Sequence, residues 1–499
     1  MFNANLDIDD GQEQAHPYLA EALPKVGTDS WQVFPDGRMQ TTWRLRPGLT
    51  WHDGTAASAD DFVFALKIYE TPELGQASST PIPQIESVVA PDSRTVVFNW
   101  KRLYPQAAAM GGDFQALPRH ILEASYEQGD MIAFSNLPFW ASQYVGLGPY
   151  KLDRWEPGAM IQGVAFDGHI SGRSKIDRVV VRFMPDENTA LTNLLAGDVH
   201  FATDRTIRFE QAQVLRQRWG TAGGTAILTP AQPRFLAVQQ RAEYANPRLL
   251  LDLRGRQAMA HAMDRNALNE GIFVGQGAPT ETLITPYFEA YQDVERGIVK
   301  YPFDPRQVEQ LLNESGYAKG SDGFFANAGG RFSVGYLQEA GDQTQREMAI
   351  ITDTWRQVGI DSQATVMSST QLRDYQVRDT YPGVYASAMG GAVKGGTKNL
   401  SNWVSSQIGT AANRWAGANY SGWSNPDYDR LYDQFSSTLD SAERNRQVVQ
   451  MARHISEEVA VIMLFFNFNV SAHSSAVTGP DSKAFDTLVD WNIDQWQMR

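Results

Sequence analysis

Histidine, serine and glycine are the residue types whose spacing would mark the commonest catalytic and cofactor sites. The eight histidines never fall into the His-Glu-x-x-His or His-x-x-x-His spacing that lets one helix face hold zinc. No Gly-x-Ser-x-Gly motif, Ser-x-x-Lys motif or Walker loop occurs, and there is no cysteine to act as a nucleophile or metal ligand. The sequence therefore predicts no metal, no cofactor and no catalytic residue. A hydrolase stays an open alternative, because triads assemble from distant residues.

Two short strings could nevertheless do chemistry. In Trp51-His-Asp-Gly54 the histidine and aspartate could form a catalytic pair. Adjacent side chains of an extended segment point apart, so we favour a structural turn. Val145-Gly-Leu-Gly-Pro-Tyr150 could cradle an anion. Its two glycines more readily indicate a place where backbone segments pass closely.

The stretch 386–398 is a third candidate, because it is rich in glycine and precedes three tryptophans, Trp403, Trp415 and Trp423. Large amphipathic rings beside a loop suit a ligand cleft. The same rings also suit a hydrophobic core, which is the commoner place for any single tryptophan. Both interpretations stay open at this point.

Charge and hydropathy exclude two classes of partner. The net charge is −14, whereas a domain that tracks phosphate backbones is normally basic, so we expect no nucleic acid partner. The longest apolar run, 459–466, is far shorter than the roughly 18 residues of a membrane span. Residues 1–10 show no basic region followed by an apolar run, so no signal peptide is visible.

The elements that must position these residues change in kind along the chain. Up to about residue 150, hairpins such as 31–45 mix with short helices such as the one that follows Ser58. Later, the strand around 179–183, the helix 189–196 and the strand 199–202 follow one another. This β-α-β order predicts a parallel sheet in that region and a multi-lobed α/β protein overall.

Six strings, in the same order and spread over nearly the whole chain, resemble the solute-binding proteins of ABC importers in the dipeptide/oligopeptide-binding family, family 5. The most specific is Trp-Arg-Leu-Arg-Pro-Gly-Leu-Thr-Trp-His-Asp-Gly at 43–54. The strings lie at 43–65, 146–152, 194–199, 254–265, 301–317 and 420–431.

The resemblance implies an α/β fold of the periplasmic-binding-protein-like type II class, with two hinged lobes and an inserted extra domain. It assigns 1–30, 170–235 and 465–499 to the first lobe, 31–169 to the inserted α+β domain and 236–464 to the second lobe. Family members begin with an export signal and a first strand. The resemblance thus implies that this chain starts downstream of both and that its first lobe is N-terminally incomplete.

The implied function is that of an extracytoplasmic protein, periplasmic or associated with the cell surface. It would capture a solute between two lobes and deliver it to the permease of an ABC importer. We expect a monomer that is not an enzyme, with a peptide-like, oligosaccharide or cationic ligand. The alternative is an esterase-like hydrolase evolved on the same scaffold.

Two positions in the sequence indicate which kind of ligand the protein can bind. Dipeptide-binding relatives hold the ligand's ammonium with the aspartate of a Trp-x-x-Asp loop and its carboxylate with an arginine. By resemblance, the first place falls within 385–392, which has no acid, and the second falls near Glu339. A buried charge without its partner is costly, so free di- and tripeptides are expected to bind poorly. The predicted ligand-binding residues are Gln338, Glu339, Ser387, Met389, Asn402, Trp403, Trp415 and Trp423.

Overall fold

The computed structural model describes residues 1–11, 14–203, 206–220, 222–390, 393–480 and 489–499. The chain divides into two compact units. Unit 1 holds 1–228, 436–439 and 470–499, and unit 2 holds 229–435 and 440–469. Unit 1 thus contains both the segment 31–169 and most of the predicted first lobe. Its further division into a lobe and an inserted domain stays a prediction.

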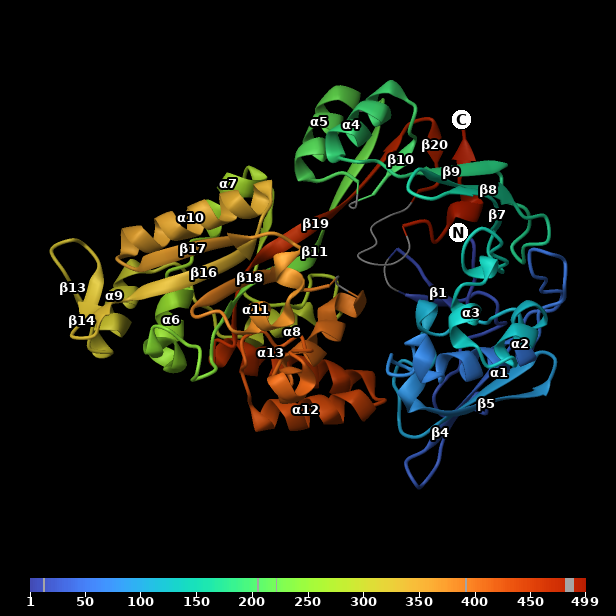
Figure 1. Cartoon of the computed structure of the whole chain (residues 1–499), viewed down its shortest axis with the longest axis horizontal. Coiled ribbons are helices and arrows are strands. Elements are labelled where there is room, and N and C mark those ends of the chain that lie inside the picture. The colour runs from blue at the N-terminus through green and yellow to red at the C-terminus, as the bar shows by residue number, and fades with distance from the viewer. Residues whose placement is uncertain (12–13, 204–205, 221, 391–392, 481–488) are drawn as a thin grey trace. The chain divides into compact units, whose positions relative to one another are not determined.

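Unit 1 contains a four-stranded antiparallel sheet in the order β3-β4-β6-β5, and its helix α1 packs on β5 (Figure 1). Alternate residues of β4 are buried, so Met39 and Trp43 join a core that includes Trp51 and Trp100. The predicted hairpins and helix are therefore confirmed. The elements are β1 (Asp7–Asp9), β2 (Ala15–Pro17), β3 (Trp31–Val33), β4 (Met39–Arg44), α1 (Ala59–Tyr69), β5 (Ile85–Asp92), β6 (Thr95–Trp100), α2 (Arg119–Tyr126) and α3 (Met131–Ser135).

The rest of unit 1 corrects one prediction. The strands near 180 and 201 do not form a parallel sheet: β9 pairs antiparallel with β8, and β10 pairs antiparallel with β19 (Val461–Ser474). The order of elements along the chain does not determine which strands pair. Here each of the two strands pairs with a strand outside the predicted β-α-β unit. The elements are β7 (Tyr150–Glu156), β8 (Met160–Ala165), β9 (Arg178–Arg182), α4 (Glu187–Ala196), β10 (Phe201–Ala202), α5 (Phe209–Trp219), β20 (Val477–Thr478) and β21 (Gln497–Met498).

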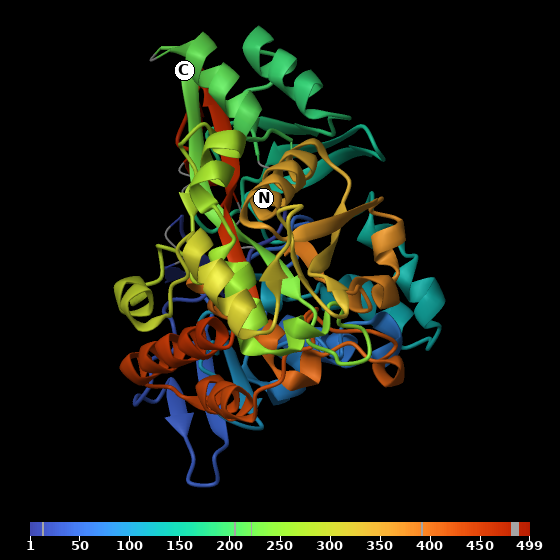
Figure 2. The same ribbon diagram turned by 90° about the vertical axis from the view of Figure 1, so that its left-hand side faces the viewer.

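Unit 2 is built on a sheet in the order β19-β11-β18-β16-β17, in which β11 and β19 run side by side (Figures 1 and 2). Strand β16 is parallel to both β17 and β18, and β18 is antiparallel to β11. The strands are β11 (Gly224–Val238), β12 (Ala278–Pro279), β13 (Ala318–Lys319), β14 (Phe325–Asn327), β15 (Gly330–Arg331), β16 (Ser333–Glu339), β17 (Asp361–Met367), β18 (Val384–Ala388) and β19 (Val461–Ser474).

Helices cover both faces of this sheet. Helix α10 lies on one face, where Glu347 forms a buried ion pair with Arg234 of β11. The opposite face carries the hydrophobic core of unit 2, to which β11, β18 and α13 contribute. In the described part of the chain, no helix is both long and apolar enough to cross a bilayer. The helices are α6 (Leu253–His261), α7 (Arg265–Phe273), α8 (Tyr291–Gly297), α9 (Pro305–Glu314), α10 (Asp342–Val358), α11 (Tyr375–Asp379), α12 (Pro426–Ser437) and α13 (Ser441–Glu457).

Candidate functional site

The carboxyl ends of the parallel strands β16 and β18 lie at one edge of the sheet, where the sequence predicted a ligand cleft. Gln338 and Glu339 are neighbours in β16, so their side chains point to opposite faces. Gln338 is fully buried, and its Nε2 donates to the carbonyl of Thr344 in α10. Glu339 is exposed. The two residues therefore do not line one wall, and their role in binding stays a prediction.

Met389 and Trp403 belong to the hydrophobic core of unit 2. Trp403 is 1% exposed, and its ring meets Phe235 edge-on with the ring centroids 5.8 Å apart. Ser387 and Asn402 are half-buried. Of the two interpretations of Trp403, this packing favours the core, and ligand contact by the four predicted residues is a prediction that awaits a bound solute.

The other two tryptophans have separate surroundings. Trp415 is half-buried, has a φ of 61°, and packs against Tyr244 with ring centroids 6.2 Å apart. Trp423 is buried, and its Nε1 donates to Glu458 at 2.7 Å. The three tryptophans thus pack on different neighbours rather than forming one aromatic wall.

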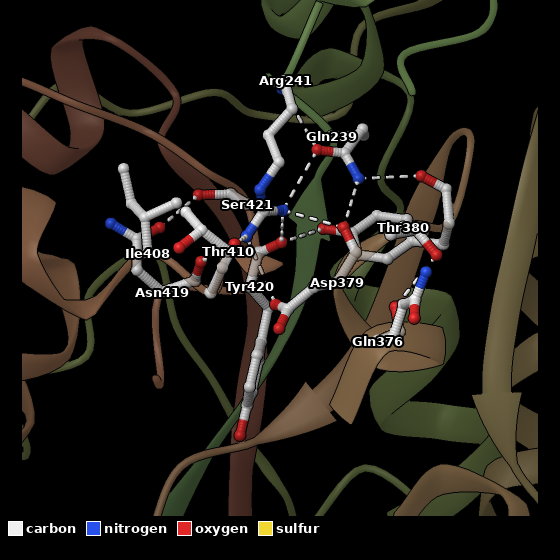
Figure 3. A network of polar contacts seen from close by, with 12 residues as sticks. Gln239, Arg241, Gln376, Asp379, Thr380, Ile408, Thr410, Asn419, Tyr420 and Ser421 are labelled. Atoms are coloured by element: carbon white, nitrogen blue, oxygen red, sulfur yellow. Dashed lines mark hydrogen bonds and ion pairs between the residues drawn. The ribbon is translucent and has the colours of Figure 1, made fainter. Parts of the chain in front are cut away.

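A polar network at the other end of β18 joins three segments of unit 2 (Figure 3). Its centre is Arg241, which follows β11. Arg241 Nη1 donates to the carbonyls of Asp379 and Tyr420 at 2.9 and 3.0 Å, and Nη2 donates to those of Gly409 and Asn419 at 3.4 and 3.3 Å. One planar cation thereby holds the loop 407–421 against the end of α11.

Asp379 is the carboxylate of this network. Its Oδ1 lies 3.3 Å from Nη2 of Arg241, and Gln239 Nε2 donates to its backbone carbonyl at 2.9 Å. Burial raises the pKa of Asp379 to about 6, although the nearby Arg241 and Arg378 oppose the rise. Its Oδ2 is buried without a hydrogen-bond partner among the described residues.

Arg378 lies one residue before Asp379 and has aromatic neighbours instead. Its guanidinium carbon is 4.4 Å from the ring centroid of Tyr375 and 5.0 Å from that of Tyr420. Figure 3 shows the Tyr420 ring extending away from the Arg241 network, while its backbone is held within it. Arg378 is half-buried, and in the described chain its Nε is buried without a partner.

Sequence reasoning missed the group of Arg241, Tyr375, Arg378, Asp379 and Tyr420. Three separate segments supply it, and although Tyr420 begins the family string at 420–431, no motif joins the three. One local signal was present: Tyr375 and Arg378 are three residues apart, the spacing that places two side chains on one helix face.

In unit 1 the two strings singled out from the sequence contact one another. His52 Nδ1 accepts a hydrogen bond from the Gly146 N–H at 3.1 Å, and Nε2 lies 3.0 Å from the Gly148 carbonyl. Burial lowers the pKa of His52 to about 4. Asp53 instead pairs with His120 at 2.7 Å, so no His52–Asp53 catalytic pair exists and the predicted structural turn is confirmed.

We call the contacts of His52 with Gly146 and Gly148 the His52 clip. Its two glycines permit backbone segments to approach closely. A Cβ at Gly146 would lie 2.1 Å from the carbonyl oxygen of Phe2, and one at Gly148 would lie 2.3 Å from that of Met1. The Gly148 N–H donates to the Phe2 carbonyl at 3.2 Å. Close packing, rather than anion binding, thus accounts for both glycines.

Comparison with known proteins identifies the class of the chain. Residues 21–411 match the family described as bacterial extracellular solute-binding proteins, family 5, middle part. The protein belongs to this family, as its six strings predicted.

Three relatives illustrate the likeness. The oligopeptide-binding protein AppA of Bacillus subtilis is 23% identical over 469 residues, which is 92% of this chain and 81% of AppA. NikA from Brucella suis in complex with Fe(III)-EDTA superposes with a TM-score of 0.80 at 18% identity, covering 100% of this chain and 94% of NikA. NikZ from Campylobacter jejuni in complex with Ni(L-His) gives 0.78 at 20% identity, covering 99% and 94%. The predicted type II binding-protein fold is confirmed.

Proposed function

We propose that the protein captures a solute outside the cytoplasm and delivers it to the permease of an ABC importer. The observation that carries this proposal is the family match over residues 21–411. We propose further that it acts as a monomer, in the periplasm or at the cell surface. Its relatives are binding proteins, which gives no support to the esterase-like alternative.

The solute class can be narrowed from the relatives' named ligands. Oligopeptides, Ni(L-His) and Fe(III)-EDTA differ in size and metal content, but all carry carboxylate groups. We propose a carboxylate-bearing solute, peptide-like or a metal chelate, in preference to an oligosaccharide or an organic cation.

The test is recovery of a solute from the purified protein. We expect native mass spectrometry to show an added mass that denaturation releases as an intact small molecule. Purified protein should also be warmed with libraries of peptides, metal chelates, oligosaccharides and polyamines. A solute at 100 times its dissociation constant should stabilise the folded state by about 2.7 kcal/mol.

Two outcomes would count against the proposal. One outcome is that the purified protein carries no added mass and that no library raises its melting temperature. The protein then does not act as a binding protein. If p-nitrophenyl esters are hydrolysed faster by the protein than by buffer, the hydrolase alternative takes its place. Permease and ATPase genes beside the gene for this chain would support import.

A further inference from the structure

The strongest unexplained feature of unit 2 is the environment of Arg378. Tyr375 and Arg378 lie on one face of α11, and the ring of Tyr420 comes from a different segment. Both rings lie within 5.0 Å of the guanidinium carbon, as in cation–π contacts. Aromatic rings cover the faces of a planar guanidinium but do not use the N–H groups at its edge, which are its hydrogen-bond donors.

Those N–H groups are not used elsewhere in the described chain. Nε of Arg378 is buried and has no acceptor among the described residues. The nearest carboxylate in sequence, Asp379, directs its Oδ1 to Arg241 at 3.3 Å. The charge of Arg378 acts on Asp379, but no acceptor in the described part of the chain meets its N–H groups. A partly buried donor without an acceptor is unfavourable, and an external carboxylate would supply one.

The surroundings of Arg378 are also fixed in advance. Arg241 donates to the backbone carbonyls of Tyr420 and Asp379, and so fixes the backbone on both sides of the cation. Tyr375 is 47% exposed, so the group is open on that side. Preorganised donors lose less conformational freedom on binding than flexible ones do.

We propose that Arg378 is the anchoring cation for a carboxylate of the solute, with Tyr375 and Tyr420 orienting its guanidinium and Arg241 acting as a positioning residue. The planar fork of N–H groups matches the two oxygens of a carboxylate. This inference rests on the proposed function, because it names the group that would hold the proposed class of solute.

The test compares probes that differ only in the carboxylate. A library of tetrapeptides with free carboxyl ends is compared with the same library amidated, and Ni(II)–L-histidine is compared with Ni(II)–L-histidinamide. The first pair tests a peptide carboxylate and the second a chelate carboxylate. We expect the wild type to bind the acid form of at least one pair about 10- to 100-fold more tightly than the amide form.

Three variants assign that preference to a residue. Arg378→Ala should lose the preference for the acid, and Arg378→Lys should keep part of it, because lysine carries the charge without the fork. Arg373→Ala is the matched control, since it removes an exposed arginine five residues earlier, and it should change affinity less than about twofold. Melting temperatures without solute will show whether each variant is folded.

The preference for the acid form over the amide form distinguishes an Arg378 that anchors the solute from an Arg378 with a purely structural role. A purely structural Arg378 would weaken binding of both forms equally and leave the preference intact, which would overturn the proposal. Equal wild-type binding of acid and amide would overturn it too. Binding of neutral oligosaccharides alone would overturn the anchor and the proposed solute class but leave solute capture for an importer standing. Failure of every solute class would end both.

Discussion

The His52 clip of unit 1 and the Arg241 network of unit 2 do the same mechanical task with different chemistry. Each uses one side chain to hold backbone segments that are distant in sequence. The imidazole of His52 is neutral, and both of its nitrogens have backbone partners. In the Arg241 network and in the adjacent Arg378 the groups are charged, and Asp379 Oδ2, Arg241 Nε and Arg378 Nε have no partners among the described residues.

That difference teaches how to separate structure from binding in this chain. A polar group whose hydrogen bonds are all made internally has nothing left to offer a solute. A buried charged group with unused hydrogen-bond donors destabilises the folded state unless water or a solute accepts those hydrogen bonds. The clip is thus a structural device, and the network is the better place to look for ligand contacts. Four measurements can break or sharpen this comparison.

The largest expected effect comes from Arg241→Ala. The substitution removes the ion-pair partner of Asp379 and one hydrogen-bond donor from each of four backbone carbonyls. We expect unfolding of unit 2 to become easier by about 3 to 5 kcal/mol, the range for breaking a buried ion pair. Calorimetry measures it. As a control, Arg254→Ala removes an exposed arginine paired with Asp252 and should cost less than about 1 kcal/mol; equal losses would contradict the central role of Arg241.

Gly146→Ala tests the clip itself. The new Cβ would lie 2.1 Å from the Phe2 carbonyl oxygen, so the backbone has to move. We expect a loss of about 2 to 3 kcal/mol, as for overpacked sites, measured by urea denaturation. Gly112→Ala is the matched control, because its Cβ would meet only Gln115 Nε2, at 3.8 Å, and should change stability by less than about 0.5 kcal/mol. A harmless Gly146→Ala would mean that the close approach is not required.

His52→Gln tests in which direction the stability of unit 1 changes with pH. The pKa of His52 is lowered from 6.5 to about 4, so its contribution is complete above pH 6.5 and is lost as the pH falls toward 4. Glutamine can accept from Gly146 and donate to Gly148 without titrating. Between pH 7 and pH 5 the wild type should lose about 2 kcal/mol relative to the variant. Melting curves at several pH values check this, and parallel curves would show that His52 does not titrate in that window.

Asp379→Asn tests a pH dependence of stability in unit 2 that should be opposite in sign to that of His52 and smaller in size. The pKa of Asp379 is raised from 3.8 to about 6, so the folded state favours the protonated form. Stability from this group is complete below about pH 4 and is lost as the pH rises toward 6. Raising the pH from 4 to 7 should cost the wild type about 1 to 2 kcal/mol relative to the variant, allowing for solvent screening. A difference that grows in the acid direction would overturn this assignment.

The family and the local elements could be predicted from the sequence because they depend on neighbouring residues. A Pro-Asp-Gly turn at 35–37 joins β3 to β4, and Asp304 caps α9 with bonds to two backbone N–H groups. Strand partners could not be predicted in the same way. The pairing of β10 with β19 joins residues 201 and 473, and nothing local to either strand indicates it.

The candidate site shows the same limit more sharply. The strings that looked chemical, such as Trp51-His-Asp-Gly54, proved to have their polar groups engaged within the fold. The group around Arg378 comes from segments more than 40 residues apart in sequence, Tyr375 and Tyr420 among them, so no spacing rule could assemble it. The alternation of side chains along β16 could have separated Gln338 from Glu339 in advance.

The division between the units has a consequence for handling the protein. Apart from the short segment 436–439, it falls after Leu228 and after Asn469, inside the long strands β11 (Gly224–Val238) and β19 (Val461–Ser474). These strands are neighbours in one sheet, so the backbone at the division is hydrogen-bonded rather than an exposed linker. A protease must draw several residues into an extended, accessible form before it can cut. Mild proteolysis should therefore nick surface loops long before it separates unit 1 from unit 2, and expression of unit 2 from residue 229 would begin in the middle of a strand.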